Sequence, residues 1–159
     1  MPEKVRYEIA LTQPLPIAPL GDQIVRSVTG DDLHGLARLM LDAYEGTIDY
    51  DDETIEDAIE EVGSFFDDGE PLLNRSYAVE GDGTILSAVL VSLVEATPFI
   101  GYVMTLPSHK NRGLARLVTT TAVERLARDG HKRIVLYITD GNTASEALFR
   151  SLGAVQVRP

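Results

Sequence analysis

Cysteine is absent from this chain of 159 residues. Without cysteine there can be no disulfide, no thiolate ligand for a metal and no cysteine nucleophile. The three histidines are scattered along the sequence, and their spacing is not that of a metal site. We therefore expect no bound metal. The sequence also shows no internal repeat.

Long apolar runs are missing as well. No apolar stretch approaches the roughly 20 residues that a membrane span needs. The N-terminal residues also lack the apolar core of a signal peptide. With 44% hydrophobic residues, the chain has enough apolar side chains for one globular domain with a core. We expect a cytoplasmic protein that does not interact with membranes.

The charge is unevenly distributed along the chain. Thirteen acidic residues and no Lys or Arg lie between Asp42 and Glu70, whereas seven basic and two acidic residues lie between Lys110 and Arg133. The formal net charge of −11 opposes binding to nucleic acid, because that function needs a broad basic surface. We expect no nucleic-acid partner, and the basic segment predicts a local site for an anion.

The junction between a predicted strand over Phe99–Leu106 and a predicted helix that starts at Gly113 is suited to an anion. The first turn of a helix presents unpaired N–H groups and the positive end of the helix dipole at one place. Gly113 lets the backbone approach a ligand because it has no Cβ. Positive charge is added nearby by Lys110, Arg112 and Arg116. The pattern predicts a phosphate or pyrophosphate site, although neither a Gly-x-x-x-x-Gly-Lys-Ser/Thr loop nor a Gly-x-Gly-x-x-Gly turn is present.

This turn reads Lys110-Asn111-Arg112-Gly113-Leu114-Ala115. It resembles the acyl-CoA-binding motif of the GNAT superfamily of acetyl-CoA-dependent N-acetyltransferases, Arg/Gln-x-x-Gly-x-Gly/Ala, with Lys at the first position. The resemblance implies that main-chain amides from Lys110 to Ala115 bind the pyrophosphate of acetyl-CoA. It also implies a role for the preceding strand, where the pantetheine is aligned and the acetyl carbonyl polarised by main-chain groups of Met104, Thr105 and Leu106.

A second segment, from Asn142 to Ala154, resembles the family's Asn-x-x-Ala-x-x-Leu-Tyr-x-x-x-Gly-Phe motif. The resemblance implies that the side chain of Asn142 contacts the pantetheine arm. Asn is also a favoured residue at the N-terminus of a helix, and the two roles are compatible. Phe149 stands where the family has the Tyr that often protonates the departing CoA thiolate. The resemblance implies that Ser145 and Phe149 also belong to the acyl-CoA-binding residues.

Phe149 carries no exchangeable proton, so the general acid is unknown. A thiol of pKa about 8.5 leaves as a moderately stable thiolate without a dedicated acid, and a well-placed acid contributes roughly 10² to 10⁴-fold. Ser145, or a water that it holds, is a candidate substitute; its alternative role is a small packing residue. For the base that accepts the amine proton, the candidates are Glu45, Glu95 or a water chain. Both carboxylates also fit as plain surface acids.

The order of elements follows that of the family, which implies an α/β (α+β) fold. We expect a mixed, mostly antiparallel central sheet flanked by about four helices, with acyl-CoA in the cleft between the family's strands 4 and 5. Alternating and helical apolar spacing predicts the elements. The strands are expected at 23–28, 76–80, 84–94, 99–106 and 133–139 with a short one after Gly153, and the helices at 33–44, 55–66, 114–126 and 144–152.

The N-terminal residues depart from the family layout. Residues 5–11 alternate between apolar and polar or small side chains, which predicts a strand, and a connector containing Pro14, Pro16 and Pro19 follows. We expect residues 1–22 to form this extra strand and connector, and 23–159 a single GNAT-like domain. The strand would cover a sheet edge, either within the chain or in a homodimer partner. The alternative is a disordered tail.

The resemblance implies direct transfer of an acetyl group from acetyl-CoA to a primary amine within a ternary complex. The acidic segment lies where the family places its acceptor-binding helices, which suggests a cationic acceptor, either a small molecule or a peptide or protein. The same segment also fits a solubilising surface. The alternative function is a non-catalytic acyl-CoA-binding or regulatory domain, for which Phe149 is the supporting feature.

Overall fold

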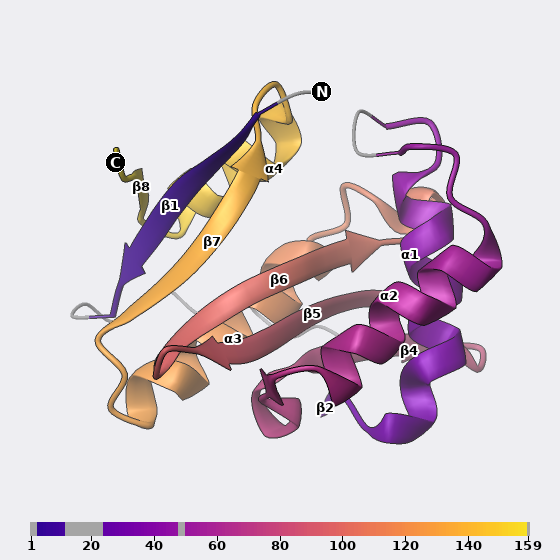
Figure 1. Cartoon of the computed structure of the whole chain (residues 1–159), viewed down its shortest axis with the longest axis horizontal. Helices are drawn as coiled ribbons and strands as arrows, with labels where there is room; N and C mark the ends of the chain where they lie inside the picture. Colours follow the sequence, from indigo (N-terminus) through magenta and orange to yellow (C-terminus); the bar gives the residue numbers. More distant parts are fainter. Residues whose placement is uncertain (1–2, 12–23, 48–49, 159) are drawn as a thin grey trace.

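The computed structural model describes residues 3–11, 24–47 and 50–158. They form one sheet in the order β2-β4-β5-β6-β7-β1-β8, and β3 also pairs with β5 (Figure 1). Only β6 and β7 pair in parallel among the strand pairs of these residues. The sheet is therefore mixed and mostly antiparallel, as predicted. The strands are β1 (Lys4–Ala10), β2 (Val25–Ser27), β3 (Glu70–Pro71), β4 (Tyr77–Gly81), β5 (Thr84–Val94), β6 (Thr97–Thr105), β7 (Arg133–Thr139) and β8 (Ala154–Gln156).

The two faces of the sheet are covered by different helices. Alternate residues of β5 pack into two separate cores, because side chains on a strand point to opposite faces. Ala88 and Leu90 pack with α1 and α2, whereas Val89 and Val91 pack with α3. Phe149 of α4 belongs to the α3 core. The α-helices of the described residues are α1 (Leu33–Tyr44), α2 (Ile55–Asp67), α3 (Leu114–Arg128) and α4 (Thr143–Ser151). None of them combines the length and apolar character that crossing a bilayer requires.

The predicted N-terminal strand is present as β1, and it pairs within the chain. It pairs with β7 along all seven of its residues and with β8 at three of them. Tyr7 and Ile9 are 3% and 1% exposed, because the apolar side of the strand faces the α3 core. The strand therefore covers the edge of β7 within the chain, one of the two expected arrangements, and β8 pairs with part of its other side. The Pro-rich connector and Gln23 lie outside the described residues.

The sheet opens between β6 and β7. These strands pair only at Phe99 with Val135 and at Ile100 with Leu136. On its other side β6 shifts register against β5, because Leu90 pairs with Tyr102 while Val91 pairs with Ile100. Gly101 is thus the extra residue of a β-bulge, which bends a strand and changes its direction. Beyond the bulge β6 diverges from β7, as Figure 1 shows.

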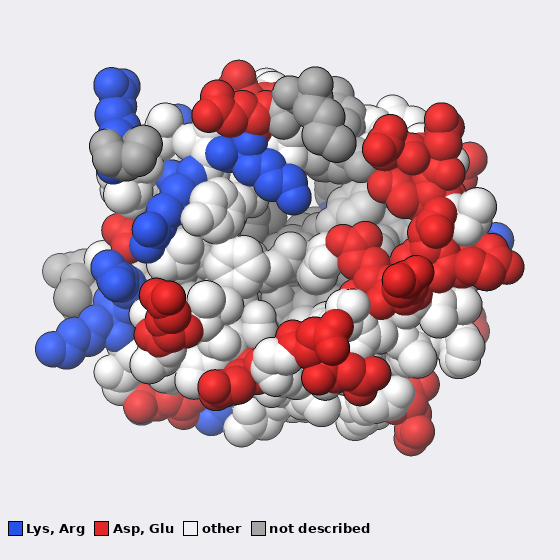
Figure 2. Space-filling model, in the orientation of Figure 1, with Lys and Arg blue, Asp and Glu red and all other residues white. Residues whose placement is uncertain are grey.

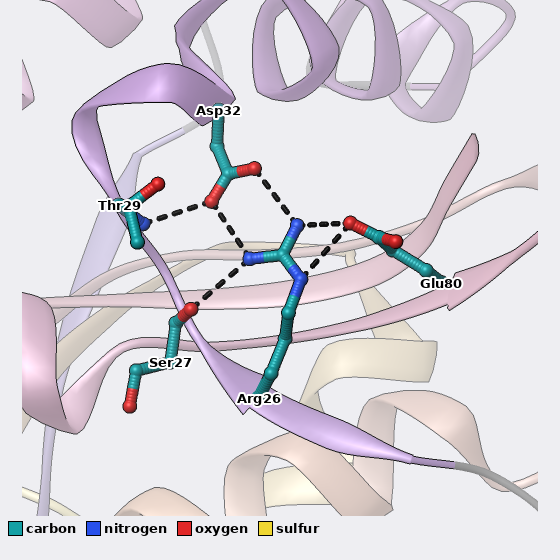
Figure 3. Close-up of polar contacts among 5 residues, drawn as sticks. All are labelled: Arg26, Ser27, Thr29, Asp32 and Glu80. Carbon is teal, nitrogen blue, oxygen red and sulfur yellow. Dashed lines mark hydrogen bonds and ion pairs between the residues drawn. The ribbon is translucent and has the colours of Figure 1, made fainter. Parts of the chain in front are cut away.

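Arg26 on β2 ties the first strand after the connector to the start of α1 and to β4 (Figure 3). Its two terminal nitrogens donate to the two carboxylate oxygens of Asp32 at 2.9 and 2.8 Å, and its Nε donates to Glu80 Oε1 at 2.9 Å. Asp32 Oδ2 also accepts the N–H of Thr29 at 2.8 Å. Bidentate, charge-assisted pairs of this kind are the strong ones. The network therefore fixes where α1 begins.

We predict that Asp32→Asn lowers the free energy of unfolding at pH 7 by about 1–3 kcal/mol. The hydrogen bonds from Arg26 hold the pKa of the Asp32 carboxyl below its usual value. The unfolded chain then binds a proton more readily than the folded one. The stabilisation is therefore complete above a pH of about 4 and is lost as the pH falls through the lowered pKa. Urea unfolding of both proteins between pH 7 and pH 3 should show the difference shrinking.

The control for this prediction is Asp42→Asn, which removes a carboxylate from the last turn of α1, whereas Asp32 lies directly before its first residue. Asp42 forms an exposed pair with Arg38 at 3.5 Å, and such pairs contribute only about 0.5 kcal/mol. Equal losses of stability in Asp32→Asn and Asp42→Asn would contradict the prediction.

Candidate functional site

The turn before α3 has the geometry of an anion site. Asn111 and Gly113 both adopt left-handed backbone conformations, with φ of 64° and 79°. The N–H of Leu117 donates to the carbonyl of Gly113 at 2.9 Å, the first hydrogen bond of the helix. The N–H groups of the three residues between them therefore have no carbonyl acceptor within the helix. They lie at the positive end of a 15-residue helix dipole.

This turn borders a cavity of about 500 Å³, here called the α3 cavity. A Cβ added at Gly113 would meet no atom of the described residues within 4 Å, so the space beside its backbone is open. Of the residues that the motifs predicted for acyl-CoA, three do not line this cavity: Leu106, Arg112 and Phe149. Those that do are Met104, Thr105, Lys110, Asn111, Gly113, Leu114, Ala115, Asn142 and Ser145. His109 and Arg116 line it as well.

The main-chain N–H and C=O groups of alternate β6 residues face this cavity. The N–H of Leu106 donates to the carbonyl of Leu86 on the β5 side at 2.9 Å. Since main-chain groups alternate between the two edges of a strand, those of Val103 and Thr105 point away from β5. Both residues line the α3 cavity. Sequence reasoning missed Val103, because the edge that each residue faces depends on the register with β5.

A second cavity of about 570 Å³ adjoins the first, and we call it the acidic cavity. Both cavities are lined by Tyr44, Val103, Asn142 and Ser145, so they meet at these residues. The acidic cavity is named for its carboxylates, which are Asp51, Glu53 and Glu61, and its other lining residues include Lys4, Tyr50, Tyr102, Tyr137 and Phe149. Figure 2 shows this face hollowed near its middle, with many acidic side chains over α1 and α2 and basic ones over β1 and β7.

The start of α4 lies at the junction of the two cavities. Asn142 Oδ1 accepts the N–H of Ser145 at 3.1 Å, so Asn142 caps this helix. This hydrogen bond confirms the predicted capping role. Asn142 also lines the wall of both cavities. Phe149 is only 5% exposed and lines the acidic cavity. The side chain at the family's Tyr position therefore faces this site.

Tyr102 and Glu61 form a polar pair in the acidic cavity. The Tyr102 hydroxyl on β6 donates to Glu61 Oε1 on α2 at 2.7 Å. Burial raises the pKa of Tyr102 well above its usual value, and the carboxylate of Glu61 raises it further. The hydroxyl therefore stays protonated at neutral pH. Helical periodicity in the sequence did not single out Glu61, because its partner is 41 residues away.

The two carboxylates proposed from the sequence as bases do not line either cavity. Glu45 is exposed directly after α1, one residue beyond Tyr44. Glu95 is exposed in the turn between β5 and β6, at the opposite end of β6 from Thr105. Of the carboxylates in the predicted acidic segment, those that line the cavity are Asp51, Glu53 and Glu61. No group of three His, Asp or Glu side chains that could hold a metal occurs in the part of the chain that the structure describes.

The FR47-like protein family matches residues 79–158, a segment that contains both the turn before α3 and α4. The chain belongs to this family. With it the chain belongs to the GNAT superfamily of acyltransferases, as the two motifs predicted. A comparison with curated proteins gave no match.

Solved GNAT structures share the fold. A GCN5-related N-acetyltransferase from Sphaerobacter thermophilus superposes with a TM-score of 0.76 at 19% identity, covering 97% of this chain and 48% of its own. This chain thus spans about half the length of that protein. The aminoglycoside N-acetyltransferase AAC(6')-Iy in complex with CoA superposes with a TM-score of 0.66 at 16% identity. The match covers 90% of this chain and 95% of that enzyme's chain. The ribosomal-protein-S18-alanine N-acetyltransferase from Escherichia coli superposes with a TM-score of 0.67 at 17% identity. The match covers 82% of this chain and 76% of that enzyme's chain.

Proposed function

We propose that this protein transfers the acetyl group of acetyl-CoA directly to the primary amine of a small cationic acceptor within a ternary complex. The observation that carries the proposal is the junction of the two cavities at Tyr44, Val103, Asn142 and Ser145. If acetyl-CoA occupies the α3 cavity with its thioester at this junction, the thioester lies beside an amine bound in the acidic cavity. Holding the two reactants in contact supplies much of the rate of such a reaction.

The α3 cavity fits CoA by its chemistry. The N–H groups at the start of α3 bind the pyrophosphate, and Lys110 and Arg116 add positive charge at the rim. The pantetheine then lies along β6, where the main-chain groups of Val103 and Thr105 face the cavity. An N–H in this position stabilises the negative charge that develops on the acetyl oxygen. The CoA complex of the similar aminoglycoside N-acetyltransferase supports this use of the fold.

The acidic cavity fits the acceptor. Its carboxylates attract an ammonium ion, and Glu61 accepts a proton from it, directly or through the hydroxyl of Tyr102. The neutral amine attacks the acetyl carbon, and a C–N bond forms. The nitrogen loses a second proton to water as the C–S bond breaks, which leaves the neutral amide. The CoA thiolate leaves with the electron pair. Phe149 carries no proton for it, so the departing sulfur leaves as thiolate or takes a proton from water or from Ser145 at the junction.

Phe149 also supports a second candidate function, a domain that binds acyl-CoA without catalysis. A CoA-release assay across a broad panel of primary amines separates the two. Release of CoA that depends on one class of amine would establish catalysis. Saturable binding of acetyl-CoA with no release above the rate of hydrolysis, for any amine, would favour the binding domain.

We predict that Gly113→Ala weakens CoA binding by about 10- to 100-fold, because a Cβ at this position separates the anion from the backbone N–H groups. The matched control is Gly130→Ala after the other end of α3. Gly130 also has a positive φ, 93°, and open space around its Cα. Both variants should lose a similar stability, about 1 kcal/mol, but only Gly113→Ala should lose affinity in calorimetry. Equal CoA affinities of the two variants would refute the anion site.

Glu61→Gln is expected to lower kcat/KM for the amine by about 10- to 100-fold, because the variant keeps the shape of the side chain but cannot accept the proton. CoA affinity should be unchanged. Glu60→Gln serves as control, since Glu60 is the exposed neighbour on α2 and lines neither cavity. Its kinetics should stay within about twofold of the parent. Equal values of kcat/KM for Glu61→Gln and Glu60→Gln would disprove the role of Glu61 as the base.

Phe149→Tyr should raise kcat by about fivefold or more, since a hydroxyl in the acidic cavity, on the same helix as Ser145 of the junction, can protonate the leaving thiolate. The same change at Phe66 on α2, which lines neither cavity, should leave kcat unaltered. A turnover that is unchanged or lower in Phe149→Tyr, in a protein of normal thermal stability, would show that protonation of the thiolate does not limit the rate.

A further inference from the structure

The acidic cavity also contains a positive charge, supplied by β1. Lys4 is the one Lys or Arg among the described residues that line this cavity. Tyr7 and Ile9 of the same strand point into the α3 core, so even-numbered residues such as Lys4 lie on the opposite face. That face is the one on which α1 and α2 pack. The N-terminal strand thus contributes a cation to a cavity whose other ionic groups are carboxylates.

The backbone position of Lys4 is fixed by hydrogen bonding on the β7 side. Lys4 pairs with Thr139, the last residue of β7. The N–H of Asp140 donates to the carbonyl of Glu3 at 2.7 Å, which continues the pairing beyond Lys4. Lys4 therefore lies on the wall formed by β1, β7 and the start of α4, whereas Glu61 comes from α2. The two charges line different walls of one cavity.

Lys4 has no carboxylate partner among residues 3–11, 24–47 and 50–158. No ion pair of Lys4 occurs among the described residues, although its neighbours on the same face do pair: Arg6 with Glu8 at 3.5 Å, and Glu8 with Arg133 at 3.0 Å. An acceptor that carries only positive charges would be repelled at this wall. An anionic group on the acceptor would be attracted to it.

We propose that the acceptor is a zwitterionic amine of the amino-acid type, whose carboxylate binds Lys4 while its reacting amine lies near Glu61. The assignment rests on the proposed function, because it uses the acidic cavity as the acceptor site. The proposal narrows the substrate class. Diamines and polyamines can bind the carboxylates of the cavity, but they carry no anionic group that could bind Lys4. The N-terminal strand is then part of the acceptor site as well as of the sheet.

The test compares amines that differ only in the carboxylate: lysine with cadaverine, ornithine with putrescine, and arginine with agmatine. Calorimetry measures their binding to the full chain saturated with CoA, which has no acetyl group to transfer. We expect at least one pair in which the amino acid binds about fivefold more tightly than its decarboxylated partner. Lys4→Met should abolish that preference. Lys132→Met, a change of an exposed lysine outside both cavities, should keep it.

The proposal is overturned if the decarboxylated amine binds as tightly or more tightly in all three pairs, or if Lys4→Met keeps the preference. Release of CoA from acetyl-CoA, measured in parallel with the same amines, reports on the proposed function separately. A carboxylate preference in binding that depends on Lys4, without any turnover, would support the acceptor site and refute the transferase. Turnover of diamines with no such preference would support the transferase and refute the zwitterionic acceptor.

Discussion

The divergence of β6 from β7 is the constraint on which the site depends. The two strands share only two paired positions before the bulge at Gly101 bends β6 away. A parallel pair that continued to the ends of both strands would bury the main-chain groups of Val103 and Thr105 in a ladder. Because the ladder stops, those groups face the α3 cavity, whose walls also include the end of α1 and the starts of α3 and α4.

The charges of the protein are arranged around this opening. The α3 cavity has a helix N-terminus, Lys110 and Arg116, whereas the ionic side chains of the acidic cavity are three carboxylates and Lys4. Each cavity therefore favours a reactant of opposite charge, in a protein whose net charge is −11. Tyr44 at the end of α1 is common to both, and the ion pair between Arg26 and Asp32 fixes where that helix begins. A structural network remote from the site thus helps to position a wall of it.

Local features of the fold could be predicted from the sequence, and features that depend on distant pairing could not. Gly113 and the apolar spacing after it identify the turn and α3, because a helix start is encoded by neighbouring residues. The alternation from Val5 to Leu11 predicted a strand but not its place between β7 and β8, since pairing partners lie more than 100 residues away. Glu61 and Lys4 were missed as site residues for the same reason. Their role appears only when α2 and β1 are placed around one cavity.

The meeting of the two cavities requires that a thioester bound along β6 ends at their junction. A crystal structure of the protein with acetyl-CoA tests it most directly. We expect pyrophosphate oxygens within hydrogen-bonding distance of the N–H groups of Leu114 to Arg116, and the acetyl carbonyl beside the backbone of Val103 or Thr105. Acetyl-CoA bound elsewhere on the protein, or with its acetyl group directed away from the acidic cavity, would contradict it.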